Sequence, residues 1–171
     1  IANEFSRLAD FFQVDISEAI ELANKHPRIN ILKPGIGVGG HCIGVDPWFL
    51  VEAAPQLSPL IRTAREVNDS QPAFIVSLVH RLLGEDLTGK RIAALGMAYK
   101  ADVDDVRESP AIEIAHLLAH EGASVLCYEP MQPALKIEGV TICDSLESTL
   151  NGVDIILILV GHQQFKHLDP V

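Results

Sequence analysis

The sequence has little positive charge and no long apolar run. Among its 171 residues, 13 are Lys or Arg and 23 are Asp or Glu, which gives a formal net charge of −10. Such a surface repels phosphate backbones and anionic lipids, so we expect no nucleic-acid partner and no membrane partner. The longest apolar run, residues 155–160, is much shorter than the ~20 residues of a membrane span, and no basic-then-apolar leader opens the chain.

Cysteine is also scarce: the three are Cys42, Cys127 and Cys143. No CxxC pair is present, which argues against a zinc or redox dithiol site and fits a reducing cytoplasm. Cys127 and Cys143 lie in strand-like segments, so we expect them in the core. His116 and His120 are four residues apart, but a solvated helix face explains that spacing. We therefore expect no metal site.

The apolar content of 48% and the mean hydropathy of +0.23 are typical of a chain that forms a globular core. Periodicity predicts helices and then alternating strands and helices, and Asp15, Asp46, Ser58 and Ser109 are the expected N-cap residues of four of the helices. The expected helices are residues 1–12, 16–26, a short one from 46, 59–82 split at Pro72, 110–118 and 146–150. The expected strands are 91–95, 124–128, 140–143 and 155–160. Continuous apolar strands alternating with helices predict an α/β fold with a parallel sheet, half of a doubly wound domain.

Both ends of the sequence suggest a piece of a longer protein. Helical periodicity begins at Ile1 without a preceding N-cap residue, and the last residues follow a strand-and-turn pattern without a closing helix. We therefore expect any function to be shared with residues outside this sequence.

One loop carries five of the 12 glycines within ten residues, which lets the backbone approach a ligand closely. Its Gly35-x-Gly37-x-x-Gly40 pattern formally matches the dinucleotide fingerprint. That fingerprint needs a strand before it and a helix immediately after it. Here Pro34 and a predicted helix precede the glycines, and residues 41–43 follow them before any helix begins. We therefore reject the dinucleotide interpretation of this loop.

Cys42 at the tip of the same loop is a candidate nucleophile. It lies close to the start of the helix predicted from Asp46, whose positive end would lower the pKa of the thiol and favour the thiolate. Asp46 is near enough to orient a water molecule or accept a proton. Two structural alternatives stay open, because cysteine is often a small buried apolar residue and Asp before Pro is often only a helix cap.

A second candidate site follows the strand at 91–95. Lys100 and Arg107 place two cations in a strand-to-helix crossover, where parallel sheets bind ligands. An anionic ligand such as a diphosphate fits them. The alternative is that Arg107 pairs with Asp104 or Asp105 and only clamps the loop.

Three segments together carry a family resemblance: GIGVGGHCIGVDPWF at 35–49, LIRTAREVND at 60–69 and GMAYK-x4-DVRESP at 96–110. They resemble the nucleotide-sugar 6-dehydrogenases, the UDP-glucose/GDP-mannose dehydrogenase family, and the cysteine loop is closest in form to the branch that acts on UDP-N-acetyl-D-mannosamine. The resemblance implies a helical dimerisation region with the cysteine loop at 1–87. A Rossmann-like UDP-sugar-binding domain at 88–171, lacking its end, would follow. The family's N-terminal Rossmann domain for NAD would precede residue 1.

The resemblance also implies a mechanism. Such enzymes oxidise the C6 alcohol of the sugar to a carboxylate with two NAD+, through a cysteine thiohemiacetal and then a thioester. Cys42 matches the nucleophile, and Asp46 matches the acidic residue that assists water in hydrolysing the thioester. The chain by itself is expected to be inactive, because the family's catalytic lysine and asparagine lie upstream.

The remaining site residues are also assigned by the resemblance. The family's glycine loop places its backbone against the sugar, a lysine contacts the substrate, an arginine lies near the cofactor and substrate phosphates, and a basic residue can reach the neighbouring subunit's nucleotide. The residues that match the glycine loop are Gly35, Gly37, Gly39 and Gly40. Lys100 matches the substrate-contacting lysine, Arg107 matches the arginine near the phosphates, and Arg28 matches the basic residue that can reach the neighbouring subunit.

Two departures from the family pattern bear on the substrate. Val45 stands where many UDP-glucose and GDP-mannose enzymes have Lys, and His41 takes a place often filled by Ser or Tyr. Both favour an N-acetylated sugar. UDP-N-acetylglucosamine and UDP-glucose stay as alternative substrates, and a non-catalytic UDP-sugar-binding or dimerisation module as an alternative function; a pure binder would have no use for Cys42.

Overall fold

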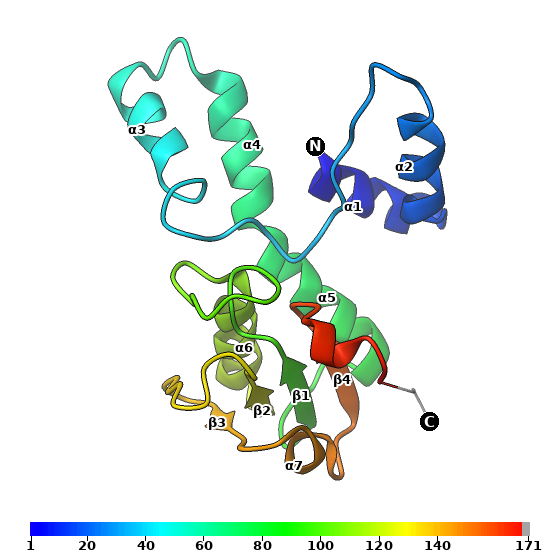
Figure 1. Ribbon diagram of the computed structural model, residues 1–171, viewed down its shortest axis with the longest axis vertical. Coiled ribbons are helices and arrows are strands. Elements are labelled where there is room, and N and C mark those ends of the chain that lie inside the picture. Colours follow the sequence, from blue (N-terminus) through cyan, green and yellow to red (C-terminus); the bar gives the residue numbers. More distant parts are fainter. Residues whose placement is uncertain (169–171) are drawn as a thin grey trace.

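The computed structural model describes residues 1–168. Two helical pairs stand above an α/β unit, and a fifth helix runs down into that unit (Figure 1). These helices are α1 (Ala2–Phe12), α2 (Ile16–Asn24), α3 (Asp46–Ala53), α4 (Pro59–Asp69) and α5 (Gln71–Leu83). The predicted split at Pro72 is confirmed, because α4 ends one residue before Ser70 and α5 begins one residue after it. Proline lacks the backbone N–H that a continuous helix would need there.

The lower unit contains a four-stranded sheet whose paired strands are all parallel, in the order β3-β2-β1-β4. The strands are β1 (Arg91–Leu95), β2 (Ser124–Tyr128), β3 (Thr141–Ile142) and β4 (Ile155–Ile158). The helices of the unit are α6 (Pro110–His120), α7 (Leu146–Leu150) and the 3-10 turn η1 (Gln163–Phe165). The predicted α/β class is confirmed, although β3 and β4 are shorter than expected. The strand order changes direction between β1 and β4, which marks the usual ligand crevice of such sheets.

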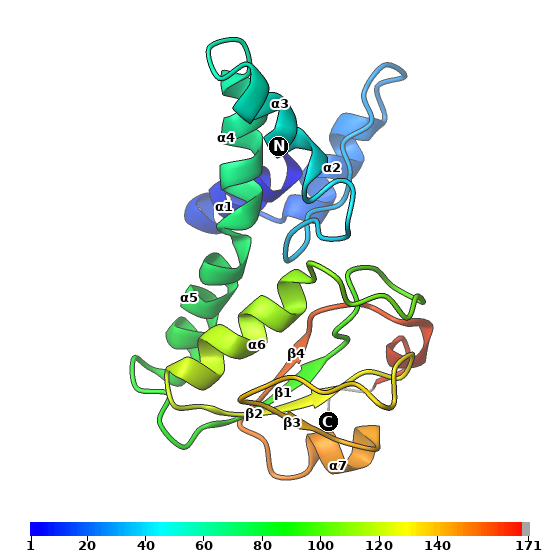
Figure 2. The same ribbon diagram turned by 90° about the vertical axis from the view of Figure 1, so that its left-hand side faces the viewer.

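Helices α5 and α6 cover one face of the sheet and α7 lies on the other side (Figure 2). The core combines buried side chains of both helices with those of the two central strands. Its members include Val76, Val79, Ile114, Leu118, Ile92, Ala94, Val125 and Cys127. By packing, α5 therefore belongs with the sheet, although the change from helices to strands in the sequence falls near residue 87.

Of the four predicted helix caps, two are confirmed by side-chain hydrogen bonds, one is wrong, and Ser58 takes the cap position of α4 without such a bond. Asp15 accepts hydrogen bonds from two backbone N–H groups of α2, and Ser109 accepts one from Ala111 at the start of α6. Asp46 does not cap α3, because it is the first residue of the helix and Val45 takes the cap position without a side-chain bond.

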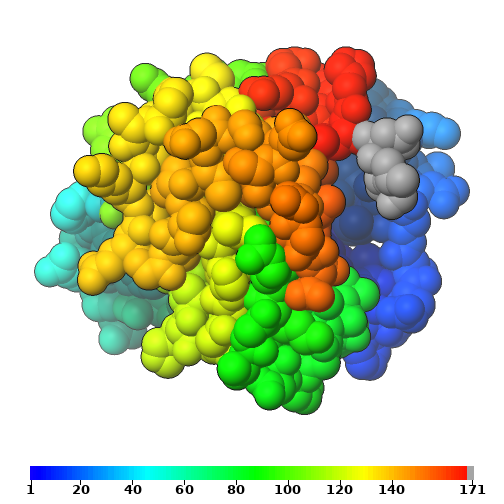
Figure 3. Space-filling model, turned by 90° about the horizontal axis from the view of Figure 1, so that it is seen from below, coloured from blue at the N-terminus to red at the C-terminus, as the bar shows by residue number. Residues whose placement is uncertain are grey.

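The end of the molecule away from the helical pairs is formed by the α/β unit. There the segments around β3 and α7 (orange) lie beside the chain that leads into β1 (green), as Figure 3 shows. No helix within residues 1–168 is long and apolar enough to cross a membrane.

Candidate active site

The glycine loop rests on the crossover loop between β1 and α6. The backbone N–H of Gly40 donates to the carbonyl of Arg107 at 3.2 Å. A Cβ atom at Gly39 would overlap the carbonyl oxygen of Glu108, and one at Gly40 would lie 3.1 Å from the ring of Tyr99. Gly39 and Gly40 are both buried. Glycine is therefore required at Gly39 by the backbone of the crossover loop, and at Gly40 by the Tyr99 ring together with a φ of 84°, whatever ligand the loop meets.

Three amide side chains hold the other end of the glycine loop. Asn3 accepts from the Gly35 N–H at 2.8 Å, Asn68 accepts from the Val38 N–H at 3.0 Å, and Gln71 donates to the Gly35 carbonyl at 3.1 Å. Asn3 also donates to Asn68 at 3.1 Å, which links α1 to α4. Sequence reasoning missed these amides, because such residues on helices are ordinarily exposed and no local pattern marks them.

Cys42 and Asp46 share one cavity. Cys42 is exposed in the turn before α3, and its carbonyl accepts from the N–H groups of Val45 at 3.0 Å and Asp46 at 2.8 Å. This turn places the cysteine just ahead of the helix N-terminus. Both side chains line a cavity of about 650 Å³ whose other walls are apolar. The exposure of Cys42 argues against the small buried residue that sequence analysis left as an alternative.

Lys100 and Arg107 are both exposed on the crossover loop. Arg107 forms the clamp that the sequence left open: its Nε and Nη2 donate to the Asp105 carboxylate at 2.9 and 2.6 Å, which lowers the pKa of Asp105 to about 2. The pKa of Arg107 is raised, chiefly by this hydrogen bond and the Asp105 charge, with a smaller contribution from Cys42. The guanidinium group therefore lies within electrostatic reach of the cysteine loop. Its Nη1 donates no hydrogen bond within residues 1–168.

A second cavity, of about 620 Å³, lies on the other side of the glycine loop between α4 and α6. Its polar wall includes Arg65, Asn68 and Glu108, and neither Cys42 nor Lys100 lines it. The Arg65 guanidinium is buried and is paired with Asp69. The candidate nucleophile therefore lines the apolar cavity and not the more polar one.

A buried polar pair at the carboxyl ends of the strands also escaped sequence analysis. Glu129, directly after β2, is 2% exposed, and His162, shortly after β4, is 1% exposed. Glu129 Oε2 accepts from the backbone N–H groups of Met97 at 2.7 Å and Ala98 at 2.9 Å. The sequence did contain a signal for this pair, a Glu directly after a strand of apolar residues, because a charged side chain at that position needs hydrogen-bond donors around it.

These contacts bear on whether the crossover fits a dinucleotide. The segment after β1 has no GxGxxG pattern, and the first two backbone N–H groups beyond Gly96 already donate to Glu129. At the start of α6, Ser109 accepts the N–H of Ala111. A dinucleotide phosphate would therefore find these amides taken, and the crossover does not fit NAD in the usual way.

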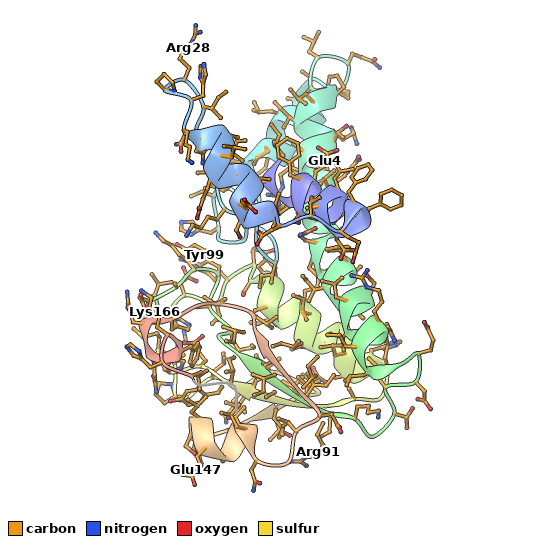
Figure 4. The ribbon with its side chains drawn as sticks, turned by 90° about the vertical axis from the view of Figure 1, so that its right-hand side faces the viewer. Glu4, Arg28, Arg91, Tyr99, Glu147 and Lys166 are labelled. Atoms are coloured by element: carbon orange, nitrogen blue, oxygen red, sulfur yellow. The ribbon has the colours of Figure 1, made fainter. Side chains whose placement is uncertain are left out.

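The remaining sequence candidates lie elsewhere. Arg28 is exposed at the tip of the α2 arm, far from Tyr99 on the crossover loop (Figure 4). Cys127 is buried as predicted, and burial raises the pKa of its thiol to about 12. The prediction that Cys143 is a core residue is wrong: it is only half-buried and lines a cavity of about 150 Å³, because β3 ends before it. Residues 1–168 hold no cluster of three His, Cys, Asp or Glu placed to bind a metal ion.

Comparison with known proteins identifies both parts of the chain. Residues 1–70 match the central domain of the UDP-glucose/GDP-mannose dehydrogenase family, and residues 93–171 match the UDP binding domain of that family. A UDP-N-acetyl-D-mannosamine dehydrogenase from Methanocaldococcus jannaschii is 47% identical over 169 residues, which are 99% of this chain. An NDP-N-acetyl-D-galactosaminuronic acid dehydrogenase from Ralstonia nicotianae is also 47% identical, over 98% of this chain.

A solved structure of a UDP-D-ManNAc dehydrogenase from Pyrococcus horikoshii superposes with a TM-score of 0.87 at 40% identity and covers 98% of this chain. The chain spans 38%, 40% and 39% of the lengths of these three proteins, in the order given. Matches to two domains of one family, in the family's own order, account for the glycine loop and the crossover loop together. The chain therefore belongs to the UDP-glucose/GDP-mannose dehydrogenase family.

Proposed function

We propose that this chain supplies the cysteine loop and the nucleotide-sugar site of an NAD-dependent UDP-sugar 6-dehydrogenase. The observation that carries the proposal is the packing of the Cys42 loop directly on the crossover loop that bears Lys100 and Arg107. The loop that carries the nucleophile and the loop that carries the two cations are thereby adjacent. This arrangement suits a reactive sugar carbon joined to a diphosphate.

We propose UDP-N-acetyl-D-mannosamine as the sugar nucleotide. The names of two equally similar relatives, a UDP-N-acetyl-D-mannosamine dehydrogenase and an NDP-N-acetyl-D-galactosaminuronic acid dehydrogenase, both support an N-acetylated hexose. His41 and Val45 favour the same class. The backbone of the loop at Gly35, Gly37, Gly39 and Gly40 would face the sugar, and Arg28 on its distant arm would serve a neighbouring subunit.

Cys42 and Asp46 would perform the covalent steps. At the aldehyde level, the Cys42 sulfur adds to C6 and the carbonyl oxygen takes a proton, which gives a thiohemiacetal. At the thioester level, Asp46 accepts a proton from water as the water oxygen attacks the acyl carbon; the C–S bond then breaks, and the Cys42 thiolate leaves and takes up that proton. In this family NAD accepts the hydrides. Because the backbone N–H groups of the crossover are already hydrogen-bonded within the chain, Arg107 is the one residue of this chain that we assign near NAD.

We also propose a homodimer in the cytoplasm. Apolar side chains on the outer faces of the helical part are exposed, among them Leu8 at 48%, Phe12 at 65% and Leu60 at 77%. A second copy of the chain would cover them. A cytoplasmic location fits an exposed thiol nucleophile, which has to stay reduced.

Binding of UDP tests the nucleotide site directly on this chain. A charge-assisted phosphate contact contributes ~1.5 to 3 kcal/mol, so Lys100→Ala should weaken UDP binding roughly tenfold or more in calorimetry. Lys90→Ala is the matched control, because Lys90 directly precedes β1 and so lies at the amino end of this strand, whereas Lys100 follows its carboxyl end. Equal UDP affinity of Lys100→Ala and the wild type would remove Lys100 from the site.

The covalent assignment is tested in a complete dehydrogenase that contains this chain. We expect Cys42→Ala to abolish the second oxidation far more than the first, because an aldehyde needs a tetrahedral adduct before a second hydride can leave. The measurement is NADH formed per sugar, with the carboxylate and aldehyde products separated by chromatography. Carboxylate formation near the wild-type rate would instead favour a non-catalytic binding module.

A further inference from the structure

The Glu129 carboxylate joins the ends of three neighbouring strands. Its Oε2 accepts from Met97 and Ala98 after β1, at 2.7 and 2.9 Å, and its Oε1 accepts from Met131 after β2, at 2.9 Å. The fourth partner is His162 after β4, whose Nε2 lies 3.2 Å from Oε2. A buried carboxylate with four donors is fully satisfied, so its burial is tolerated and its position is fixed.

The contacts of His162 define its protonation. Its Nδ1 accepts from the backbone N–H of Asp102 at 2.9 Å, so that nitrogen carries no proton. The proton is therefore on Nε2, which donates to Glu129. The neutral ring thus connects the fixed carboxylate to a single backbone group of the crossover loop.

That backbone group lies at a strained point of the loop. Asp102 has φ of 60°, a left-handed conformation that costs a non-glycine residue energy unless its surroundings impose it. Two contacts impose it here: the bond from its N–H to His162, and the bond from the Gln163 N–H to its carboxylate at 2.9 Å. Lys100 is only two residues earlier in the chain.

The same loop supports the cysteine loop. Tyr99, the residue before Lys100, contacts the glycine loop. Its N–H donates to the Asp105 carbonyl at 3.0 Å, and its ring lies against Gly40. Gly40 is two residues from Cys42. The position of Asp102 therefore affects where a phosphate ligand would bind beside Lys100. It also affects how the crossover loop supports the loop that carries Cys42.

We infer that Glu129 and His162 are positioning residues for the nucleotide site: through the bond from the Asp102 N–H to His162 they set the loop that carries Lys100 at the crevice between β1 and β4. The inference rests on the proposed function, because it assigns a supporting pair to the same UDP site. Its distinctive claim is that one atom, His162 Nδ1, matters more for UDP affinity than the rest of the ring.

Two substitutions separate the two ring nitrogens. In His162→Asn, the amide oxygen can replace Nδ1 as the acceptor for Asp102, whereas the donor to Glu129 is lost. In His162→Gln, the longer amide can replace Nε2 as the donor to Glu129, whereas the acceptor for Asp102 is lost. Both variants remove the same buried ring, so a merely structural role would affect both alike.

The test combines calorimetry with UDP and amide hydrogen exchange by NMR. We expect His162→Gln to bind UDP at least fivefold more weakly and to lose exchange protection at Asp102. His162→Asn should bind within about twofold of the wild type and keep that protection, although its melting temperature falls as much. Equal UDP affinity of the two variants, with protection lost only in His162→Gln, would overturn the inference.

Two further measurements cover the other outcomes. If neither variant folds, ring nitrogen NMR of the wild type decides, because a proton on Nδ1 would overturn the inference and a proton on Nε2 alone would support it. Lys100→Ala separates this inference from the proposed function. If Lys100→Ala weakens UDP binding and His162→Gln does not, only the positioning role is wrong; if Lys100→Ala has no effect, the UDP site is wrong and the inference falls with it.

Discussion

At the scale of single residues, the cysteine loop depends on glycine where its backbone meets another backbone. Gly39 faces the Glu108 carbonyl with no room for a Cβ atom, whereas Gly35 has nothing within 4 Å of where its Cβ would be. The loop glycines therefore differ in kind. Gly39 and Gly40 are required by their contacts with the crossover loop, whereas a side chain at Gly35 would have room.

This difference gives a matched prediction. Gly39→Ala should destabilise the protein by about 1 to 3 kcal/mol, because the added methyl must push the glycine loop off the crossover loop. Gly35→Ala should stay within about 0.5 kcal/mol of the wild type. Denaturant unfolding of both variants measures the effect. A Gly39→Ala variant as stable as Gly35→Ala would show that the two loops do not pack as described.

At the scale of elements, α5 and α6 are joined by an ion pair at their ends. His80 Nε2 on α5 lies 2.7 Å from the carboxylate of Glu121, directly after α6, and its Nδ1 faces the Gly84 carbonyl. The pKa of His80 is raised, chiefly by the Gly84 carbonyl, with desolvation opposing and Glu121 adding to it. Protonated His80 therefore stabilises the contact between these helices.

The sign of the pH dependence follows from this shift. Because the folded pKa lies above the ordinary value of 6.5, the stabilisation is fully present below about pH 6.5 and is lost as the pH rises through the raised value. The melting temperature of His80→Gln should therefore fall further below that of the wild type at pH 6 than at pH 8.5. His116→Gln, at an exposed position of α6, is the control. A His80→Gln deficit that is equal at both pH values would contradict the role of the ion pair.

At the scale of the whole molecule, the helical part leaves apolar side chains uncovered. Phe11 is 78% exposed, Phe12 65%, and Leu57 and Leu60 are 87% and 77% exposed on the opposite arm (Figure 1). Large apolar side chains that are exposed together on two arms are typical of a surface that a partner covers. The proposed dimer gives them a partner.

Sedimentation equilibrium tests the dimer. We expect a mass of twice 18.6 kDa at tens of micromolar, because burial of two such arms contributes ~25 cal/mol per Å² of apolar surface. Leu60→Asp should shift the equilibrium towards monomer, whereas Leu82→Asp, on the exposed side of α5, should not. A monomeric wild type under these conditions would count against the proposal.

The local elements were predictable because their signals are local. The bounds of β1, β2 and α7 agree with the expected ranges, and Asp15 and Ser109 cap the helices that their spacing predicted. Each depends on residues within a few positions of one another. The identities of Cys42, Lys100 and Arg107 as candidates also came from local chemistry and from motif resemblance.

The tertiary structure decided the contacts between segments that are far apart in the chain. Sequence patterns could not show that Asn3 and Gln71 hold Gly35, or that His162 reaches Asp102 across 60 positions. They also misplaced Asp46 as a cap, because the turn at Cys42 already supplies the first bonds of α3. The physical reason is that local propensity depends on neighbours in the chain, whereas a buried polar group is set by whichever distant donor the fold brings to it.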